Sequence, residues 1–209
     1  MKGSKTVFYR QSEFTYDEES RSYSGYGIVF DSDSLPLNIG GKKVYERIKR
    51  EFLEEADMSD VLATFNHNFD QIFGRSSSGT LTLEIDDTGV KYRFELPDTS
   101  YASDLAVMTQ RKDIKGSSFG FLIDFRDYEF EERGDSEVVA YPTKIERILD
   151  IGPVVNPAYP STTAENRSAF AVAAENYIEK RAMENESEEE EINNDHVFAR
   201  LRVLKHAAC

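Results

Sequence analysis

Gly116-Ser117-Ser118-Phe119-Gly120-Phe121 is the stretch on which the interpretation of this sequence depends. Two glycines flank a pair of hydroxyl side chains, and apolar and polar residues then alternate to residue 130, a pattern that predicts a long strand. A serine at the start of such a strand would present an exposed Oγ on a rigid support, as a nucleophile requires. A Gly-Ser turn that merely begins a strand explains the same residues. The choice therefore depends on what else the chain supplies.

A serine nucleophile needs a base within hydrogen-bond reach and a third group that orients the base. Of three histidines, only His67 lies in the well-patterned part of the chain, after an apolar run at residues 61–65 that predicts a buried strand. His67 is a candidate base, although a histidine that caps its strand by hydrogen bonding fits the same position.

The candidates for the third group are Asp150 and Glu146, which follow Ser118 on a later predicted strand. Side chains at even spacing on a strand share a face, so the two carboxylates compete for one role. Asp150 stands between two apolar residues, where a carboxylate must find a partner. A surface acid on an edge strand is the plainer interpretation of the same residue.

Periodicity predicts a β-rich α+β fold with about seven or eight strands and about two helices. Residues 80–96 predict a hairpin that turns at 87–89, while residues 44–53 and about 99–112 predict amphipathic helices. We expect a closed or barrel-like, mostly antiparallel sheet with a few outer helices.

The chain divides into three parts by composition. Residues 1–24 form a polar lead-in with an edge strand near residues 14–16, residues 25–167 form the patterned body, and residues 168–209 form an acidic tail. Residues 164–180 predict a helix, the acidic run at 184–191 predicts disorder, and residues 197–204 predict a short amphipathic helix.

Composition argues against several classes of protein. The net charge of −14 repels a nucleic-acid backbone, so we expect no nucleic-acid partner. No apolar run approaches the ~18 residues of a membrane span, and one histidine in the body is too few for a structural zinc site. We expect no metal, no cofactor and no membrane contact. Cys209 is the only cysteine, which fits a reducing compartment.

Six short motifs occur in order between residues 25 and 167. They are Gly25–Phe30, Glu46–Ile48, Asp60–Asn68, Gly74–Leu81, Lys115–Phe121 and Asp150–Pro160. Together they resemble the prohead, or capsid-maturation, proteases of tailed bacteriophages of the HK97 type. The resemblance implies that residues 25–167 are the protease domain and that the histidine after an asparagine and the serine before Phe-Gly-Phe are the catalytic pair.

In this sequence those residues are His67 and Ser118. The resemblance also implies a fold related to the herpesvirus assembly proteases, whose triad is Ser-His-His; this body has no second histidine, so an acid must serve as the third member. The family pattern carries Glu, an apolar residue and Ser near Asp150, and this chain departs from it at Asp150 and Gly152. Ser117 is an alternative to Ser118, but neighbouring strand residues face opposite ways.

The expected function is that of a serine endopeptidase. The resemblance implies as substrates the scaffold or the scaffold-like N-terminal region of the major capsid protein, and the enzyme itself, cut inside a procapsid in the cytoplasm of a host bacterium. Homo-oligomerisation stays open. The alternatives are a non-enzymatic capsid scaffold or interaction protein, and a small-ligand-binding barrel with an apolar cavity.

Overall fold

The computed structural model describes residues 5–7, 14–114, 116–155 and 169–184. Its strands are β1 (Lys5–Val7), β2 (Phe14–Asp17), β3 (Ser22–Val29), β4 (Leu37–Ile39), β5 (Lys42–Glu46), β6 (Leu62–Thr64), β7 (Ile72–Arg75), β8 (Leu81–Ile85), β9 (Gly89–Glu95), β10 (Gly116–Asp124), β11 (Tyr128–Arg133), β12 (Glu137–Pro142) and β13 (Arg147–Val154). The helices are α1 (Ser100–Gln110), a helix over residues 169–184, and the 3₁₀ turns η1 (Arg50–Leu53) and η2 (Ser76–Ser78).

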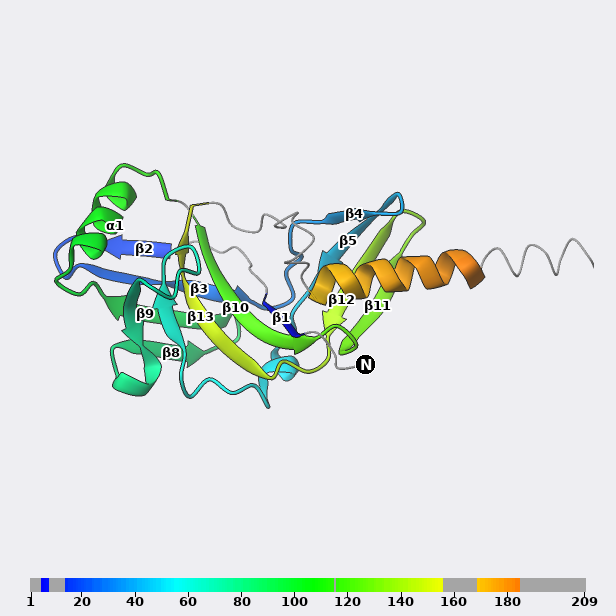
Figure 1. Cartoon of the computed structure of the whole chain (residues 1–209), viewed down its shortest axis with the longest axis horizontal. Coiled ribbons are helices and arrows are strands. Elements are labelled where there is room, and N and C mark those ends of the chain that lie inside the picture. Colours follow the sequence, from blue (N-terminus) through cyan, green and yellow to red (C-terminus); the bar gives the residue numbers. More distant parts are fainter. Residues whose placement is uncertain (1–4, 8–13, 115, 156–168, 185–209) are drawn as a thin grey trace, which may run out of the picture.

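These strands form three sheets. The central sheet has the order β1-β10-β13-β6-β7, the first outer sheet β2-β3-β9-β8, and the second outer sheet β11-β12-β5-β4. Figure 1 shows β10 and β13 as long curved strands in the middle of an elongated molecule, with one outer sheet toward each end. Pairing is antiparallel except between β12 and β5 and between β13 and β6.

The expectation of a closed or barrel-like sheet is wrong. Each sheet is open in the part of the chain that the structure describes, and the central sheet ends on β1 at one edge and β7 at the other. Closure requires a consistent tilt and stagger across all strands. Alternation within single strands does not encode these quantities, which is why the strand pattern could not distinguish a barrel from three open sheets.

The local predictions had mixed outcomes. The hairpin over residues 80–96 is confirmed as β8 and β9, and the helix near 99–112 is confirmed as α1. The helix predicted over residues 44–53 is wrong, because this segment contains the end of β5 and the turn η1. Val44 and Ile48 are both fully buried, but Val44 lies on a strand beside β12, so their four-residue spacing does not reflect a helix face.

Strands β10 and β13 supply much of the core. Every residue of β10 except Leu122 is buried, and five consecutive residues at the end of β13 are buried as well. A strand covered on both faces reads as a nearly continuous apolar run, as residues 119–123 do. The buried polar residues of these strands are Ser117, Ser118, Asp124 and Asp150.

The helix over residues 169–184 packs on the second outer sheet (Figure 1). Phe170 and three alanines of this helix are buried in the core, Tyr177 stacks on Phe130 with ring centroids 4.4 Å apart, and Arg181 donates to Glu132 at 3.2 Å. The predicted helix is thus confirmed from residue 169 onward. The acidic run and residues 197–204 lie outside the described residues, and the domain limits at 24 and 167 stay predictions. None of the described helices is both long enough and apolar enough to cross a membrane.

Candidate active site

Strand β6 ends three residues before His67 and fixes the approach of that residue to the central sheet. Leu62 and Ala63 pair in parallel with Asp150 and Ile151 of β13. The chain then turns through two residues with left-handed backbone angles, Asn66 (φ 53°) and His67 (φ 58°). Such angles are uncommon outside glycine and persist where surrounding contacts impose them.

Asn66 supplies those contacts. Its backbone N–H donates to the Pro153 carbonyl at 3.1 Å, and its side-chain Oδ1 accepts from the Val155 N–H at 2.9 Å. Both partners lie at the end of β13. The turn that carries His67 is therefore attached to the strand that carries Asp150.

The structure brings His67 and Asp150 into direct contact. Nδ1 of His67 lies 2.8 Å from Oδ2 of Asp150, whose side chain is completely buried, while 9% of the His67 side chain is exposed. An ionised carboxylate can only accept hydrogen bonds, so with Asp150 ionised Nδ1 carries the hydrogen of this bond. In the neutral imidazole the lone pair then resides on Nε2, where a general base needs it.

Ser118 lies on β10, which neighbours β13 on the side opposite β6. It pairs with Gly152 across the sheet, and Asp150 pairs with Gly120 two residues further along β10. The sequence suggested an exposed Oγ, but Ser118 is completely buried. Among the described residues its Oγ has no hydrogen-bond partner.

Ser117 has a different environment. Its hydroxyl donates to the hydroxyl oxygen of Tyr92 at 2.8 Å and lies 3.2 Å from the Gly152 carbonyl oxygen. Burial raises the pKa of the Tyr92 hydroxyl well above its usual value, so this partner stays protonated. The Ser117 hydroxyl is thus engaged in a buried contact, whereas the Ser118 hydroxyl is not bonded to any described group.

Glu146 lies away from His67. It precedes β13 and pairs through its backbone, donating to the Leu122 carbonyl at 2.9 Å and accepting from the Asp57 N–H at 2.9 Å. Three residues lie between it and Asp150, which corresponds to at most about 13 Å of extended chain at 3.3 Å per residue. Of the two candidate acids, the structure places Asp150 at the histidine.

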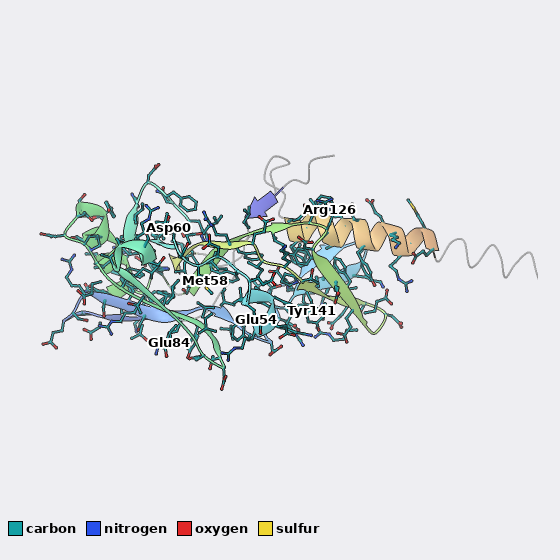
Figure 2. All side chains as sticks on the ribbon, turned by 90° about the horizontal axis from the view of Figure 1, so that it is seen from below. Glu54, Met58, Asp60, Glu84, Arg126 and Tyr141 are labelled. Carbon is teal, nitrogen blue, oxygen red and sulfur yellow. The ribbon has the colours of Figure 1, made fainter. Side chains whose placement is uncertain are left out.

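The segment that leads into β6 contains Met58 and Asp60 (Figure 2). Ion pairs hold it in place. Arg75 of β7 donates to both carboxylate oxygens of Asp60, at 2.6 and 2.5 Å, and Arg147 of β13 donates to Asp57 at 2.6 Å. Hydrogen bonds from Ser59, supported by Arg147, lower the pKa of Asp57 to about 2. Both pairs are therefore charged at neutral pH and attach this segment to the strands on either side of β6.

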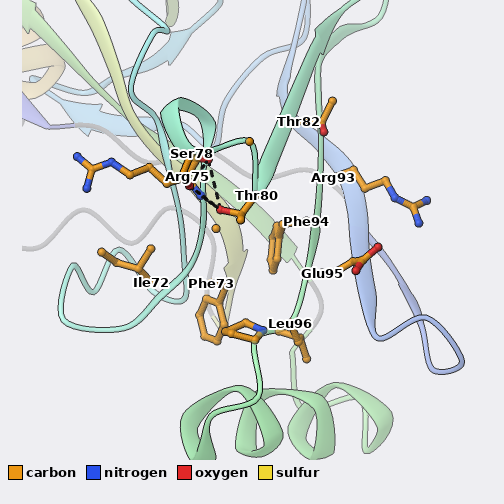
Figure 3. Close-up of a pocket in the computed structure, with 13 residues that line it drawn as sticks. Ile72, Phe73, Arg75, Ser78, Thr80, Thr82, Arg93, Phe94, Glu95 and Leu96 are labelled. Atoms are coloured by element: carbon orange, nitrogen blue, oxygen red, sulfur yellow. Dashed lines mark hydrogen bonds between the residues drawn. The ribbon is translucent and has the colours of Figure 1, made fainter.

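An open hollow of about 740 Å³ lies beside β7 and the β8–β9 hairpin. Figure 3 shows Phe73 and Phe94 toward its interior and the guanidinium groups of Arg75 and Arg93 pointing outward. Ser118, His67 and Asp150 do not line it. The candidate site is therefore separate from this hollow and consists of the residues around Asp150. Within the described ranges no group of three or more His, Cys, Asp or Glu residues could hold a metal ion.

A buried carboxylate bonded to an imidazole forms the Asp-His part of a serine-hydrolase triad, and Ser118 lies on the strand next to that of Asp150. A family model described as caudovirus prohead serine protease matches residues 6–177 of this chain. The match covers well over half of the chain, and the protein therefore belongs to that family, whose members are serine proteases of phage capsid maturation. No curated protein matches the chain.

One solved structure is similar, that of the bacteriophage T4 capsid assembly protease, gp21. The two chains share 9% identity with a TM-score of 0.43, and the match covers 72% of this chain and 98% of the T4 chain. Nothing in these comparisons supports the expected likeness to the herpesvirus assembly proteases.

Sequence reasoning proposed His67, Ser118 and Asp150 as site residues but assigned no role to Thr64 or Asn66. Asn66 lies inside the motif Asp60–Asn68, and its position directly before His67 indicates a role in placing the histidine. Thr64 reads as one residue of an apolar run, so its side-chain contact could not be inferred from the sequence.

Proposed function

We propose that Ser118 is the nucleophile of this prohead protease, that His67 is its general base and acid, and that Asp150 orients the imidazole. The contact between His67 Nδ1 and Asp150 Oδ2 at 2.8 Å is the observation that carries the proposal. The strand order β10-β13-β6 adds support. Ser118 and Asp150 lie on the neighbouring strands β10 and β13, and His67 follows β6, the next strand of the sheet.

The chemistry is acyl transfer in two stages. Nε2 of His67 takes the proton of the Ser118 hydroxyl as Oγ attacks the carbonyl carbon of the scissile peptide. Asp150 stabilises the imidazolium that forms, and Nε2 then gives the proton to the leaving amine. In the second stage His67 removes a proton from water, the hydroxide attacks the acyl-serine, and the proton returns to Ser118 Oγ. Backbone N–H groups would hold the oxyanion in both stages.

Access to the nucleophile requires a change in this structure. Ser118 has no exposed surface, and a peptide carbonyl must come within about 3–3.5 Å of Oγ to react. We therefore assign the structure to a resting state of the enzyme in which the contact between His67 and Asp150 is formed and the nucleophile is covered.

The substrates we propose are capsid-assembly proteins: the scaffold or the scaffold-like N-terminal region of the major capsid protein, and the protease itself. The family places the enzyme in the prohead, and we place the assembly in the cytoplasm of the host bacterium. The acidic run at residues 184–191 is a suitable site of self-cleavage, since a segment of this composition does not bury a core.

The decisive test compares Ser118→Ala with Ser117→Ala. Each variant is produced together with the capsid or scaffold protein, and new termini are identified by intact-mass spectrometry. Loss of a nucleophile costs several orders of magnitude, so Ser118→Ala should lower the rate by at least about 10³-fold. Ser117→Ala should be much milder, because it removes a contact with Tyr92 and leaves the proposed nucleophile in place.

Near-normal cleavage by Ser118→Ala would refute the assignment of the nucleophile. Equal loss in both variants, with lower melting temperatures in both, would show that the start of β10 matters only for folding. Absence of cleavage in the unmodified protein, under conditions where the capsid protein assembles, would favour a non-enzymatic scaffold role.

A further inference from the structure

Oδ2 of Asp150 has a second donor besides His67. The Thr64 hydroxyl donates to this oxygen at 2.5 Å, and both residues are buried, with exposed fractions of 1% for Thr64 and 0% for Asp150. The other carboxylate oxygen, Oδ1, has no hydrogen-bond partner among the described residues. One oxygen of a buried carboxylate thus receives both side-chain hydrogen bonds described for it.

The backbone fixes the position of the Thr64 hydroxyl. Thr64 is the last residue of β6 and pairs with Ile72 of β7. Its carbonyl oxygen lies so close to Gly152 of β13 that a Cβ on that glycine would approach it to 2.1 Å. A β-branched side chain has few χ1 rotamers, so a backbone held this firmly also restricts the hydroxyl.

The same short segment supplies both donors. Thr64 and His67 are three residues apart, and the left-handed turn at Asn66 and His67 brings the imidazole back toward the oxygen that Thr64 already contacts. Asp150 is therefore bonded from two points of one segment, and the direction of its carboxylate is defined relative to the imidazole.

We propose that Thr64 is a positioning residue of the catalytic site, whose hydroxyl holds the Asp150 carboxylate in the orientation that His67 requires. This inference rests on the proposed roles of Ser118, His67 and Asp150. Hydrogen bonds to a charged group are stronger than those between neutral groups, and a buried charge with few donors is unfavourable. The hydroxyl therefore stabilises the carboxylate and restricts its rotation.

Thr64 acts on the reaction only through Asp150 and His67. Without the hydroxyl, His67 is the single described donor to the carboxylate, which gains freedom to rotate and orients Nε2 less well. We expect an effect on kcat rather than on KM, because the Thr64 side chain is buried and its hydroxyl bonds to Asp150.

The test uses three substitutions that separate the hydroxyl from the volume of the side chain. Thr64→Val keeps the shape and removes the hydroxyl, Thr64→Ala removes both the hydroxyl and a methyl group, and Thr64→Ser keeps the hydroxyl. The loss of one charge-assisted hydrogen bond predicts a fall in kcat of about 10- to 100-fold for Val and Ala, with Ser within about threefold of the unmodified protein.

A second measurement does not depend on cleavage. In the Ser118→Ala background, which should be inert toward itself, the Nδ1 proton of His67 should give a proton NMR signal far downfield of the amides. Thr64→Val should broaden or shift this signal, and Thr64→Ser should preserve it. If Thr64→Val fails to fold, the Ala and Ser variants provide the same comparison.

The outcomes distinguish this inference from the proposed function. If Ser118→Ala cleaves normally, the catalytic assignment itself fails. If Ser118→Ala is inactive while folded Thr64→Val and Thr64→Ala keep the kcat and the downfield signal of the unmodified protein, Thr64 has no positioning role. A fall in kcat in all three variants alike, Ser included, would also overturn the inference, because the hydroxyl would then not be responsible.

Discussion

Replacing Gly152 with alanine should separate β13 from β6 at the candidate site. Gly152 has φ +156°, an angle that residues with a side chain rarely adopt, and it lies opposite Ser118 in the sheet. A Cβ built on it would lie 2.1 Å from the Thr64 carbonyl oxygen and 3.2 Å from the Thr64 carbonyl carbon and nitrogen. These are backbone atoms, so no side-chain rotation can relieve the contact.

The size of the effect follows from the distance. Cβ contacts below 3.0 Å essentially never occur, so the gap must grow from 2.1 Å to at least 3.0 Å, that is by 0.9 Å. Overpacking costs about 1–3 kcal/mol and a disfavoured backbone angle about 1–3 kcal/mol, which together predict a loss of about 2–6 kcal/mol in the free energy of unfolding. For a chain of this size the melting temperature should fall by about 2–4 °C per kcal/mol, hence by at least about 4 °C.

The assay is thermal unfolding together with cleavage at a temperature where the variant is folded. Movement of Thr64 away from β13 should weaken its bond to Asp150, so cleavage should fall as well. Gly134→Ala is the matched control, because Gly134 has φ +69° but a Cβ added there would meet no atom within 4 Å. Equal melting temperatures for the two variants would refute the close approach of β13 and β6.

Two further predictions concern the acid and the helix. Asp150→Asn should lower kcat/KM by up to about 10⁴-fold, the loss seen when the triad acid of another serine protease is replaced, while Glu146→Gln should change it little; steady-state kinetics decides, and the reverse order would move the role to Glu146. Phe170→Ala should cost about 3–5 kcal/mol of unfolding free energy, since this side chain is 6% exposed, whereas Met183→Ala on the same helix, 69% exposed, should stay within about 0.5 kcal/mol. Calorimetry of both variants measures the difference, and equal stabilities would mean that the helix over residues 169–184 does not unfold with the body.

Local features of the fold could be predicted because they depend on nearby residues. The turn at residues 87–89 and the alternation on both sides of it define the β8–β9 hairpin, and Thr99 precedes a helix that begins at Ser100. Features that depend on distant pairing could not be predicted. The arrangement of three open sheets is one of them, and the complete burial of Ser118 is another.

The contacts of the candidate site also depend on pairing between distant residues. Period two places Asp150 and Glu146 on one face of a strand but does not say which of them meets His67. The register of β13 against β6 decides this, since Leu62 pairs with Asp150 and Glu146 lies before the strand begins. The contact of Thr64 with Asp150 depends on the same register, which connects residues more than eighty positions apart.

The close approach of β6 to β13 offers one physical reason why a glycine stands at position 152 and a short acid at position 150. Gly152 packs on the Thr64 carbonyl oxygen with no room for a Cβ, so a serine at this position would push the two strands apart. With β6 this near, the short side chain of Asp150 reaches Thr64 and His67 at hydrogen-bond distance. A glutamate has one more methylene group and would place its carboxylate beyond these donors unless β6 moved outward. The glycine at 152 therefore allows β6 to approach β13, and at that distance the short acid at 150 reaches both of its donors.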